Sequence, residues 1–272
     1  MNYFNMVVQV VLTVFIGLFF LLFILFNVIE PSYMMFFNKP LFIHWYPFSK
    51  RLKPHQRKIL SDDFPYYSTL SAKRKEYFEH RILMFTKQYQ FIGKDLVVTE
   101  QMRLLIAATY VMLTFGMRNY LVPLFKRIVI YPTAYFSTEN EVFHKGEFNP
   151  MMKAVVFSWE DFILGHLSST DNLNLGLHEF THVLHFHCMK NNDPSSIIFF
   201  DAFNEVVKYF SDSVLSSSLS DAQYFRSYAY ENQFEFLAVV LEHFFETPAQ
   251  FKTVHPDLYD HVVTMINYRE NQ

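Results

Sequence analysis

The N-terminal run of apolar residues places the strongest constraint on how this chain can fold. Residues 1–29 contain no charged side chain, and the stretch 6–28 is almost entirely apolar. A helix of about 23 residues can cross a hydrocarbon core roughly 30 Å thick. A signal peptide would have a basic start, a shorter apolar core and a small-residue cleavage site. A soluble core helix rarely stays apolar on every side for this length. We therefore expect residues 1–29 to form a transmembrane anchor, in which residues 6–28 lie within the membrane.

The distribution of positive charge predicts the orientation of this anchor. No Lys or Arg precedes Lys39, and five more follow by Lys58. Such an excess normally stays in the cytoplasm, so we expect a single-pass membrane protein with its C-terminal domain on the cytoplasmic side. Residues 30–60 are basic and aromatic and are interpreted as a juxtamembrane linker. Its aromatic residues form either an interfacial belt or a stretch packed on the domain, and the sequence leaves both open.

The remaining residues, 61–272, are expected to form one domain. A net charge of −3 without a basic stripe gives no reason to expect nucleic acid as a partner. The single cysteine, Cys188, excludes an intrachain disulfide and a cysteine-only zinc site, and it fits a reducing compartment. The chain has 33 Phe, 17 Tyr and only six Gly, a composition typical of a helix-rich core with bulky side chains.

An HExxH motif lies in the second half of the chain. His178 and His182 are four residues apart, so on a helix they lie on one face and can present two imidazoles to one metal ion. Glu179 lies beside them, where a general base for a metal-bound water is needed. An amphipathic helix with histidines at its polar edge is the alternative interpretation. Asp171 and Asn172 are candidate N-caps, and the residues before Pro194 end the helix.

A zinc site of this kind needs a third protein ligand and an open position for water. The metzincin pattern places a third histidine ten residues after the first, but Cys188 occupies that position. His185 lies about 10 Å along the helix axis from His178, so we expect it to contact the site indirectly or to be exposed. A glutamate on a later helix is the other common source. Four residues qualify by type, and spacing alone does not choose among them: Glu231, Glu235, Glu242 and Glu246.

The rest of the domain shows helical and extended patterns. Helices are predicted over residues 71–90, 99–116, 197–210 and 233–246, and strands over 127–131, 142–144 and 154–158. Asn232 and Glu235 have the spacing of a capping box at the start of the last helix. The serine-rich stretch 211–221 is predicted to be a loop. Strand 154–158 is our candidate for an edge strand that holds an extended peptide by main-chain hydrogen bonds.

Several separate segments resemble one known family. They are Ser158-Trp159-Glu160, the motif at 177–182 and the stretch 228–238, with weaker matches at 104–108 and 130–132. Together they resemble the Mlc titration factor A (MtfA) family of zinc metallopeptidases over roughly residues 60–265. The combination is far more specific than HExxH alone, and the apolar segment lies outside it.

This resemblance implies a fold and a site. The fold is zincin-like, α+β: a mostly helical domain with a small sheet beside the HExxH helix, here preceded by one transmembrane helix. By resemblance, His178, His182 and Glu235 bind one Zn²⁺ per chain in a site of the gluzincin type, and Glu179 is the catalytic base. Tyr228 matches a tyrosine near the metal that could donate a hydrogen bond to the oxyanion. The chain departs from the family at His185, where the family often has an acidic residue.

The expected function is zinc-dependent hydrolysis of peptide or protein substrates. Zinc would lower the pKa of a water, and Glu179 would take its proton and pass it to the leaving amine. A second hypothesis is a zinc-containing binding protein with little or no catalysis, which captures a transcriptional regulator, since the family is named for such a capture. The third hypothesis is a purely structural metal ion. It ranks last because structural sites usually have four protein ligands, whereas this site has three and an apparent base.

Overall fold

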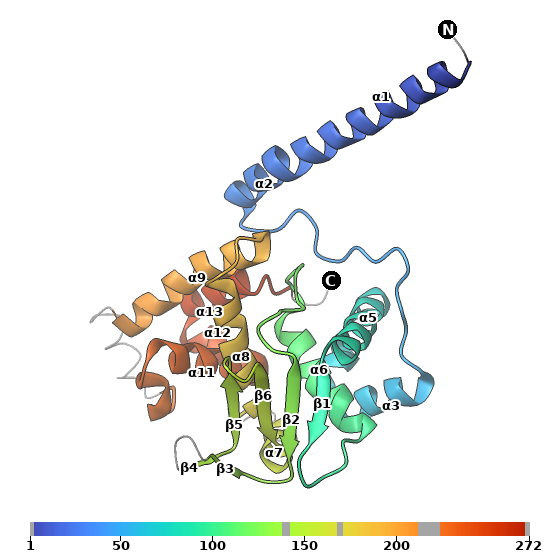
Figure 1. Cartoon of the computed structure of the whole chain (residues 1–272). Coiled ribbons are helices and arrows are strands. Elements are labelled where there is room, and N and C mark those ends of the chain that lie inside the picture. The colour runs from blue at the N-terminus through green and yellow to red at the C-terminus, as the bar shows by residue number, and fades with distance from the viewer. Residues whose placement is uncertain (1–2, 138–141, 168–170, 212–223, 270–272) are drawn as a thin grey trace.

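A four-stranded sheet organises the part of the chain that follows the N-terminal helix (Figure 1). The computed structural model describes residues 3–137, 142–167, 171–211 and 224–269. In spatial order the strands are β1 (Gln90–Gly93), β2 (Arg127–Tyr131), β6 (Ala154–Ser158) and β5 (Gly146–Asn149). The first three are parallel, and β5 runs antiparallel to β6. Strands β3 (Tyr135–Ser137) and β4 (Val142–His144) form a separate antiparallel pair.

Helices make up most of this part of the chain. Their bounds are α3 Pro54–Asp63, α4 Pro65–Thr69, α5 Ala72–Gln88, α6 Glu100–Leu113, α7 Trp159–Leu167, α8 Leu175–Cys188, α9 Pro194–Ser211, the 3₁₀ helix η2 Ser227–Tyr230, α11 Gln233–Glu246, α12 Pro248–Val254 and α13 Pro256–Met265. The expected fold class, a mostly helical α+β domain of the zincin type with a small sheet beside the HExxH helix, is confirmed. The predicted loop 211–221 lies outside the described residues except for Ser211, which ends α9.

Most predicted elements form close to the expected residues, and the caps show why. Asn232 caps α11 by accepting hydrogen bonds from the N–H groups of Phe234 and Glu235. The start of α8 differs from the prediction, because the cap is Asn174 rather than Asp171 or Asn172. The Asn174 side chain accepts from the N–H of Leu177 at 3.0 Å. Asn172 has a φ of 57°, a left-handed conformation that turns the chain just before the helix.

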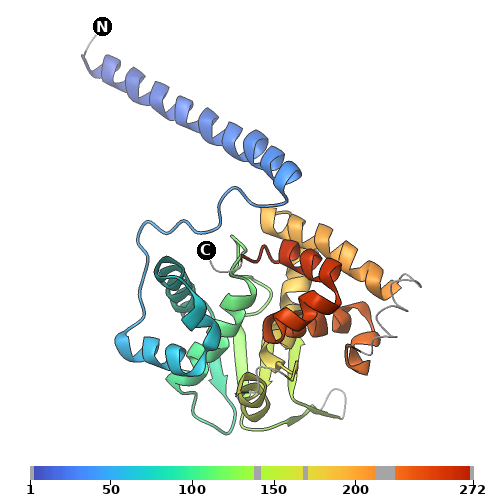
Figure 2. The same cartoon turned by 180° about the vertical axis from the view of Figure 1, so that it is seen from behind.

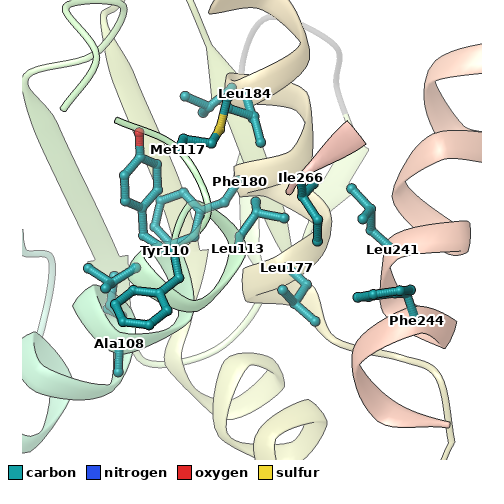
Figure 3. Packing of buried hydrophobic residues seen from close by; sticks show 14 of the residues in the cluster. Ala108, Tyr110, Leu113, Met117, Leu177, Phe180, Leu184, Leu241, Phe244 and Ile266 are labelled. Carbon is teal, nitrogen blue, oxygen red and sulfur yellow. The ribbon is translucent and has the colours of Figure 1, made fainter. Parts of the chain in front are cut away.

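Helix α8 is held by a core between the sheet and the neighbouring helices. Figure 3 shows side chains of α6, α8 and α11 meeting in this core. Phe180 is fully buried, and its ring lies 5.3 Å from that of Phe157 on β6 and 5.0 Å from that of Tyr110 on α6. Burial of one such side chain contributes about 1.5–3 kcal/mol. The inward residues Leu177, Phe180 and Leu184 therefore fix α8 against the sheet, while the motif histidines lie along another side of the helix.

The sheet has two different faces. Ile128 and Val155 belong to the main core under the helices, whereas Val129, Ala154 and Val156 form a small cluster on the opposite face. Tyr131 and Tyr135 pack against this small cluster. The second face is therefore covered by few side chains.

The edge of the sheet nearest α8 is β5, so our prediction that strand 154–158 is the edge strand is wrong. That strand, β6, pairs with β2 on one side and β5 on the other, and all five of its residues are buried. A continuous apolar run is typical of a buried strand, and β6 lies inside the sheet with all of its residues buried.

The N-terminal apolar segment is a long helix that stands away from the rest of the chain (Figures 1 and 2). It comprises α1 (Tyr3–Ile24), a π-helical turn η1 (Leu25–Ile29) and α2 (Glu30–Phe37). Residues 3–24 are all exposed, and the helix is long and apolar enough to cross a membrane. The segment after it follows the domain surface, with His44 packed on Tyr77 of α5 and with Trp45 and Phe48 exposed.

Candidate active site

Helix α8 brings the three polar residues of the HExxH motif to one region. The imidazole rings of His178 and His182 lie 4.8 Å apart, as expected for residues one helical turn apart. His178 and Glu179 are both buried, with 8% and 7% of their surfaces exposed. The helix therefore presents two imidazoles and one carboxylate from a single turn, held in place by the apolar residues on its inner side.

Helix α11 contributes a second carboxylate to the same region. The Oε2 atom of Glu235 lies 2.9 Å from Nε2 of His178, and its Oε1 atom lies 3.6 Å from Nε2 of His182. One ligand atom from each of these three residues can be chosen so that all lie within 4.8 Å of one another. Glu235 is the third residue after the Asn232 cap, and its N–H donates to the Asn232 side chain, so its backbone is fixed by the first turn of α11. The capping interpretation of Asn232 and the metal interpretation of Glu235 are therefore compatible.

The other nitrogen of His178 is also bonded to a carboxylate. Nδ1 of His178 and Oε1 of Glu242, two turns further along α11, lie 3.0 Å apart. Arg226 pairs with the same carboxylate, with one of its nitrogens 3.1 Å from Oε1 of Glu242. The Glu242 side chain is 1% exposed. A histidine that donates Nδ1–H to a carboxylate offers its Nε2 lone pair to a metal, which is the usual arrangement in zinc sites.

The charges of the site fit a divalent cation. Burial lowers the pKa of His178, but Glu235 and Glu242 outweigh this effect and raise it to about 10. Burial lowers the pKa of His182 to about 4 and raises that of Glu179 to about 7. The site contains three carboxylates, two imidazoles and one guanidinium: those of Glu179, Glu235, Glu242, His178, His182 and Arg226. Without a metal ion His178 is protonated at neutral pH and partly balances the carboxylates, and a bound divalent cation would take the place of this proton. The donor set, two imidazole nitrogens and a carboxylate, is also one that suits zinc.

Tyr228 lies on the open side of this group. It belongs to η2, its ring is 5.8 Å from that of His178, and it is 39% exposed. Its hydroxyl is hydrogen-bonded to Glu235, and burial together with this carboxylate raises the pKa of Tyr228. The hydroxyl therefore remains protonated at neutral pH and is able to donate a hydrogen bond.

The structure separates the four glutamates that the sequence left as candidates for the third ligand. Glu235 alone joins the two histidines in the metal-binding group, and Glu242 bonds the outer nitrogen of His178. Glu231 is exposed at the end of η2. Glu246 accepts a hydrogen bond from Asn174 at 3.1 Å. The role of Glu242 was missed, although its spacing of seven residues from Glu235 places both on one helical face. Arg226 carries no sequence signal that would have identified it.

His185 is buried, so the expectation that it is exposed is wrong, and the expectation that it contacts the site indirectly stays a prediction. It is 2% exposed, which contradicts surface exposure, and its ring lies 4.4 Å from that of Phe203 and 4.9 Å from that of Phe234. Among the described residues, neither of its ring nitrogens has a hydrogen-bond partner. Burial lowers the pKa of His185 to about 4, so it is a neutral ring within an aromatic cluster beside the site.

Strand β5 passes directly beside Glu179 and the start of α8. A Cβ atom on Gly146 would lie 2.7 Å from Cδ1 of Leu175 and 3.0 Å from Cγ of Glu179. A glycine at this position therefore allows the sheet edge to approach α8. The backbone N–H of Phe148 donates a hydrogen bond to the Glu179 carboxylate and lowers its pKa, against the larger effect of burial. The edge strand and Glu179 are thus in direct contact.

A motif helix beside a small sheet, joined by a carboxylate from a later helix, makes the chain a zincin-like protein. The model of the glucose-regulated metallo-peptidase M90 family matches residues 48–266, and the chain belongs to this family. It is therefore a metallopeptidase, and the resemblance to the MtfA family is confirmed. An uncharacterized protein of Synechocystis is 29% identical over 237 residues, which cover 78% of this chain and 83% of the relative.

Proposed function

We propose that this chain is a membrane-anchored zinc peptidase in which His178, His182 and Glu235 hold one Zn²⁺ per chain. The observation that carries the proposal is the convergence of these three side chains, whose ligand atoms lie within 4.8 Å of one another. Two imidazoles and one carboxylate form the protein part of a catalytic zinc site of the gluzincin type and leave a position for water. When bound, zinc supplies a Lewis acid that polarises a carbonyl and lowers the pKa of water to about 7.

Glu179 is the general base in this proposal. It takes a proton from the water that attacks the peptide carbonyl and returns it to the nitrogen of the leaving amine. Its position next to His178 and its contact with the Phe148 N–H hold the carboxylate between the helix and the sheet edge. Water is largely excluded there, because Glu179 is 7% exposed.

Tyr228 and strand β5 position the substrate. The Tyr228 hydroxyl donates a hydrogen bond to the carbonyl oxygen as negative charge develops on it. An extended peptide pairs with the free edge of β5, whose backbone groups supply main-chain hydrogen bonds. Catalysis thus uses groups from α8, α11, η2 and β5, which the fold brings together from distant parts of the sequence.

The domain arrangement is part of the proposal. Residues 1–29 form the anchor, which crosses the membrane through residues 6–28. Residues 30–60 form the juxtamembrane linker, and residues 61–272 form the peptidase domain. The length and apolar exposure of the helix support this assignment. The basic residues from Lys39 onward favour a cytoplasmic peptidase domain.

Peptide cleavage by the full-length protein in detergent tests the proposal. A mixed panel of short peptides is incubated with wild type, with Glu179→Gln and with Glu231→Gln, an exposed glutamate outside the metal-binding group. We expect cleavage that is lost with a chelator, restored by zinc, absent in Glu179→Gln and unchanged in Glu231→Gln. Zinc content should be the same in all three proteins. Normal cleavage by Glu179→Gln would show that the base is misassigned. If all three proteins bind zinc and none cleaves a peptide, the peptidase assignment fails and the chain is interpreted as a zinc-containing binding protein.

A further inference from the structure

The direction of each backbone group on β5 follows from its pairing with β6. The N–H of Ser158 donates to the carbonyl of Lys145 at 2.6 Å, and Glu147 is the register partner of Val156. In an antiparallel ladder, alternate residues bond to the same neighbour. The backbone groups of Lys145 and Glu147 therefore face β6, whereas those of Gly146 and Phe148 face the free edge. A bound peptide strand would hydrogen-bond to the backbone of Gly146 and to the carbonyl of Phe148, because the Phe148 N–H already donates to Glu179.

The side chains of β5 alternate between the two faces of the sheet. Gly146 and Phe148 face α8, since a Cβ on Gly146 would meet Glu179 and the Phe148 ring lies 5.8 Å from that of Phe186. Glu147 therefore lies on the opposite, sparsely covered face. There the Tyr135 hydroxyl donates to Oε2 of Glu147 at 3.2 Å.

Glu147 carries a charge that the described part of the chain does not neutralise. Its hydrogen-bond donors, the hydroxyl of Tyr135 and the amide of Asn149, are both neutral. Among the described residues it forms no ion pair, because the nearby Lys145 pairs instead with Asp161 at 2.7 Å. The side chain is half-buried, and its charge is one of the causes that raise the pKa of Glu179, so the two carboxylates are close. Neutral hydrogen-bond donors fix the Glu147 carboxylate at the sheet edge, and it has no ion-pair partner among the described residues. Such a carboxylate is suited to bind a cation.

We propose that Glu147 is a specificity-determining residue that binds an ammonium or guanidinium group of the substrate. The inference rests on the proposed peptidase function and names the substrate class: peptides with a positive charge opposite Glu147. Because Gly146 and Phe148 make the main-chain bonds, Glu147 and the substrate residue opposite it form the more closely spaced type of cross-strand pair. Opposite charges in such a pair attract. The cation comes either from a Lys or Arg side chain or from a free amino terminus.

The test compares peptides that differ only in one charge. A set of peptides places Lys, Arg or the neutral norleucine at each position, with either a free or an acetylated amino terminus. For wild type we expect kcat/KM to be about tenfold higher for the cationic member at one position, the size of effect that a hydrogen bond to a charged group gives. If kcat/KM rises only with Lys or Arg at that position, the cation is a substrate side chain. If it rises only with a free amino terminus, the cation is the terminal ammonium group.

Variants at Glu147 connect this preference to one carboxylate. Glu147→Gln should lose the preference, so that cationic and neutral peptides are cleaved with equal kcat/KM, and Glu147→Lys should prefer Asp or Glu at the same position. Glu160→Gln removes an exposed carboxylate on α7 and should behave as wild type. If wild type cleaves cationic and neutral peptides equally well, the role of Glu147 is overturned and the proposed peptidase function stands.

Peptide binding separates failure of this inference from failure of the proposed function. Dissociation constants of the same labelled peptides are measured by fluorescence anisotropy with wild type and Glu147→Gln. If no peptide is cleaved but the cationic peptides bind more tightly only when Glu147 is present, the recognition role holds and the peptidase assignment fails. If the binding of cationic and neutral peptides is also equal, the role of Glu147 is overturned whatever the activity.

Discussion

Nδ1 of His178 and Oε1 of Glu242 lie 3.0 Å apart, and this contact joins α8 to α11 at the candidate metal site. Glu242 is almost fully buried and is also paired with Arg226, so its carboxylate has little freedom to move. The hydrogen bond sets the tautomer of His178 and directs its Nε2 atom toward Glu235. The orientation of one imidazole therefore depends on a residue that lies outside the metal-binding group.

The first prediction is that Glu242→Gln weakens zinc binding. The amide cannot accept the His178 proton with the strength of a carboxylate, and it also leaves Arg226 without its ionic partner. Loss of such a supporting contact typically lowers metal affinity about 10–100-fold. Competition with a chromophoric chelator measures the change. Glu246→Gln is the matched control, because it alters a partly buried glutamate on the same helix that bonds Asn174 instead of a histidine. Equal affinities for Glu242→Gln and wild type would contradict the positioning role.

The second prediction concerns Tyr228→Phe, which removes only a hydroxyl. If this hydroxyl stabilises the developing oxyanion, kcat should fall by about 100-fold while KM changes little. Zinc content should stay at the wild-type level, because Tyr228 is not one of the three metal-binding residues. Tyr230→Phe, two residues away in the same 3₁₀ helix, should retain activity. A rise in KM at constant kcat would instead assign Tyr228 to ground-state binding of the substrate.

Elements with strong local patterns could be predicted from the sequence. The β-branched stretch Arg127–Tyr131 and the apolar stretch Ala154–Ser158 form strands with the predicted bounds. The histidine spacing of HExxH required only a helix to bring both rings together, and α8 supplies it. The choice of Glu235 among four glutamates depended on the family resemblance, because residues on one helical face are equivalent by spacing alone.

Features that depend on contacts between separate elements could not be predicted. Strand Gly146–Asn149 has no alternating apolar pattern, and it is extended because it pairs with β6. Without β5, strand 154–158 had the appearance of an edge. The same limit applies to His185, whose burial comes from Phe203 and Phe234 on two other helices. In each case the cause is a contact with another element, which the periodicity of the segment itself does not reveal.

The third prediction concerns stability at acidic pH and rests on His44. Its ring lies 4.7 Å from those of Tyr77 and Phe115. Burial, and then the charges of Arg81 and Arg74, lower the pKa of His44 to about 2. The folded protein therefore keeps this ring neutral, whereas the unfolded chain binds a proton near pH 6.5. Stability is fully present above pH 6.5 and falls below it by about 1.4 kcal/mol per pH unit for this one group.

Replacement of His44 by Phe should make this pH dependence weaker. Phe preserves the ring contacts but cannot bind a proton, so the slope of the unfolding free energy between pH 6 and 4.5 should decrease by about 1.4 kcal/mol per unit. Denaturant unfolding of the metal-free protein measures the slope without a contribution from metal release. Phe48→Leu is the control, because it changes an exposed ring of the same segment without removing an imidazole, and it should leave the slope unchanged. An unaltered slope in His44→Phe would mean that His44 titrates in the folded state as it does in the unfolded chain.

The fourth prediction concerns the junction between the apolar helix and the peptidase domain. Glu30 is 3% exposed and forms a two-point ion pair with Arg118. The Arg118 guanidinium also donates to the carbonyl of Phe42 at 3.0 Å and lies over the ring of that residue. Its backbone N–H donates to Ser195 at the start of α9. The helix is therefore attached to the domain by a buried charge pair as well as by the chain.

Arg118→Ala should break this attachment, because it leaves the Glu30 carboxylate buried without a partner. Removal of one member of a buried pair typically costs about 3–5 kcal/mol, whereas replacement of both by apolar groups is often neutral. We therefore expect trypsin to cut after Lys50 and Arg51 much faster in Arg118→Ala than in wild type, and the double variant Glu30→Leu/Arg118→Met to resist cleavage better than the single one. Cleavage at the wild-type rate in Arg118→Ala would show that the junction does not depend on the pair. The ranking of the three proteins distinguishes loss of the ion pair from simple loss of side-chain volume, because both variants shorten Arg118 but only one leaves an uncompensated charge.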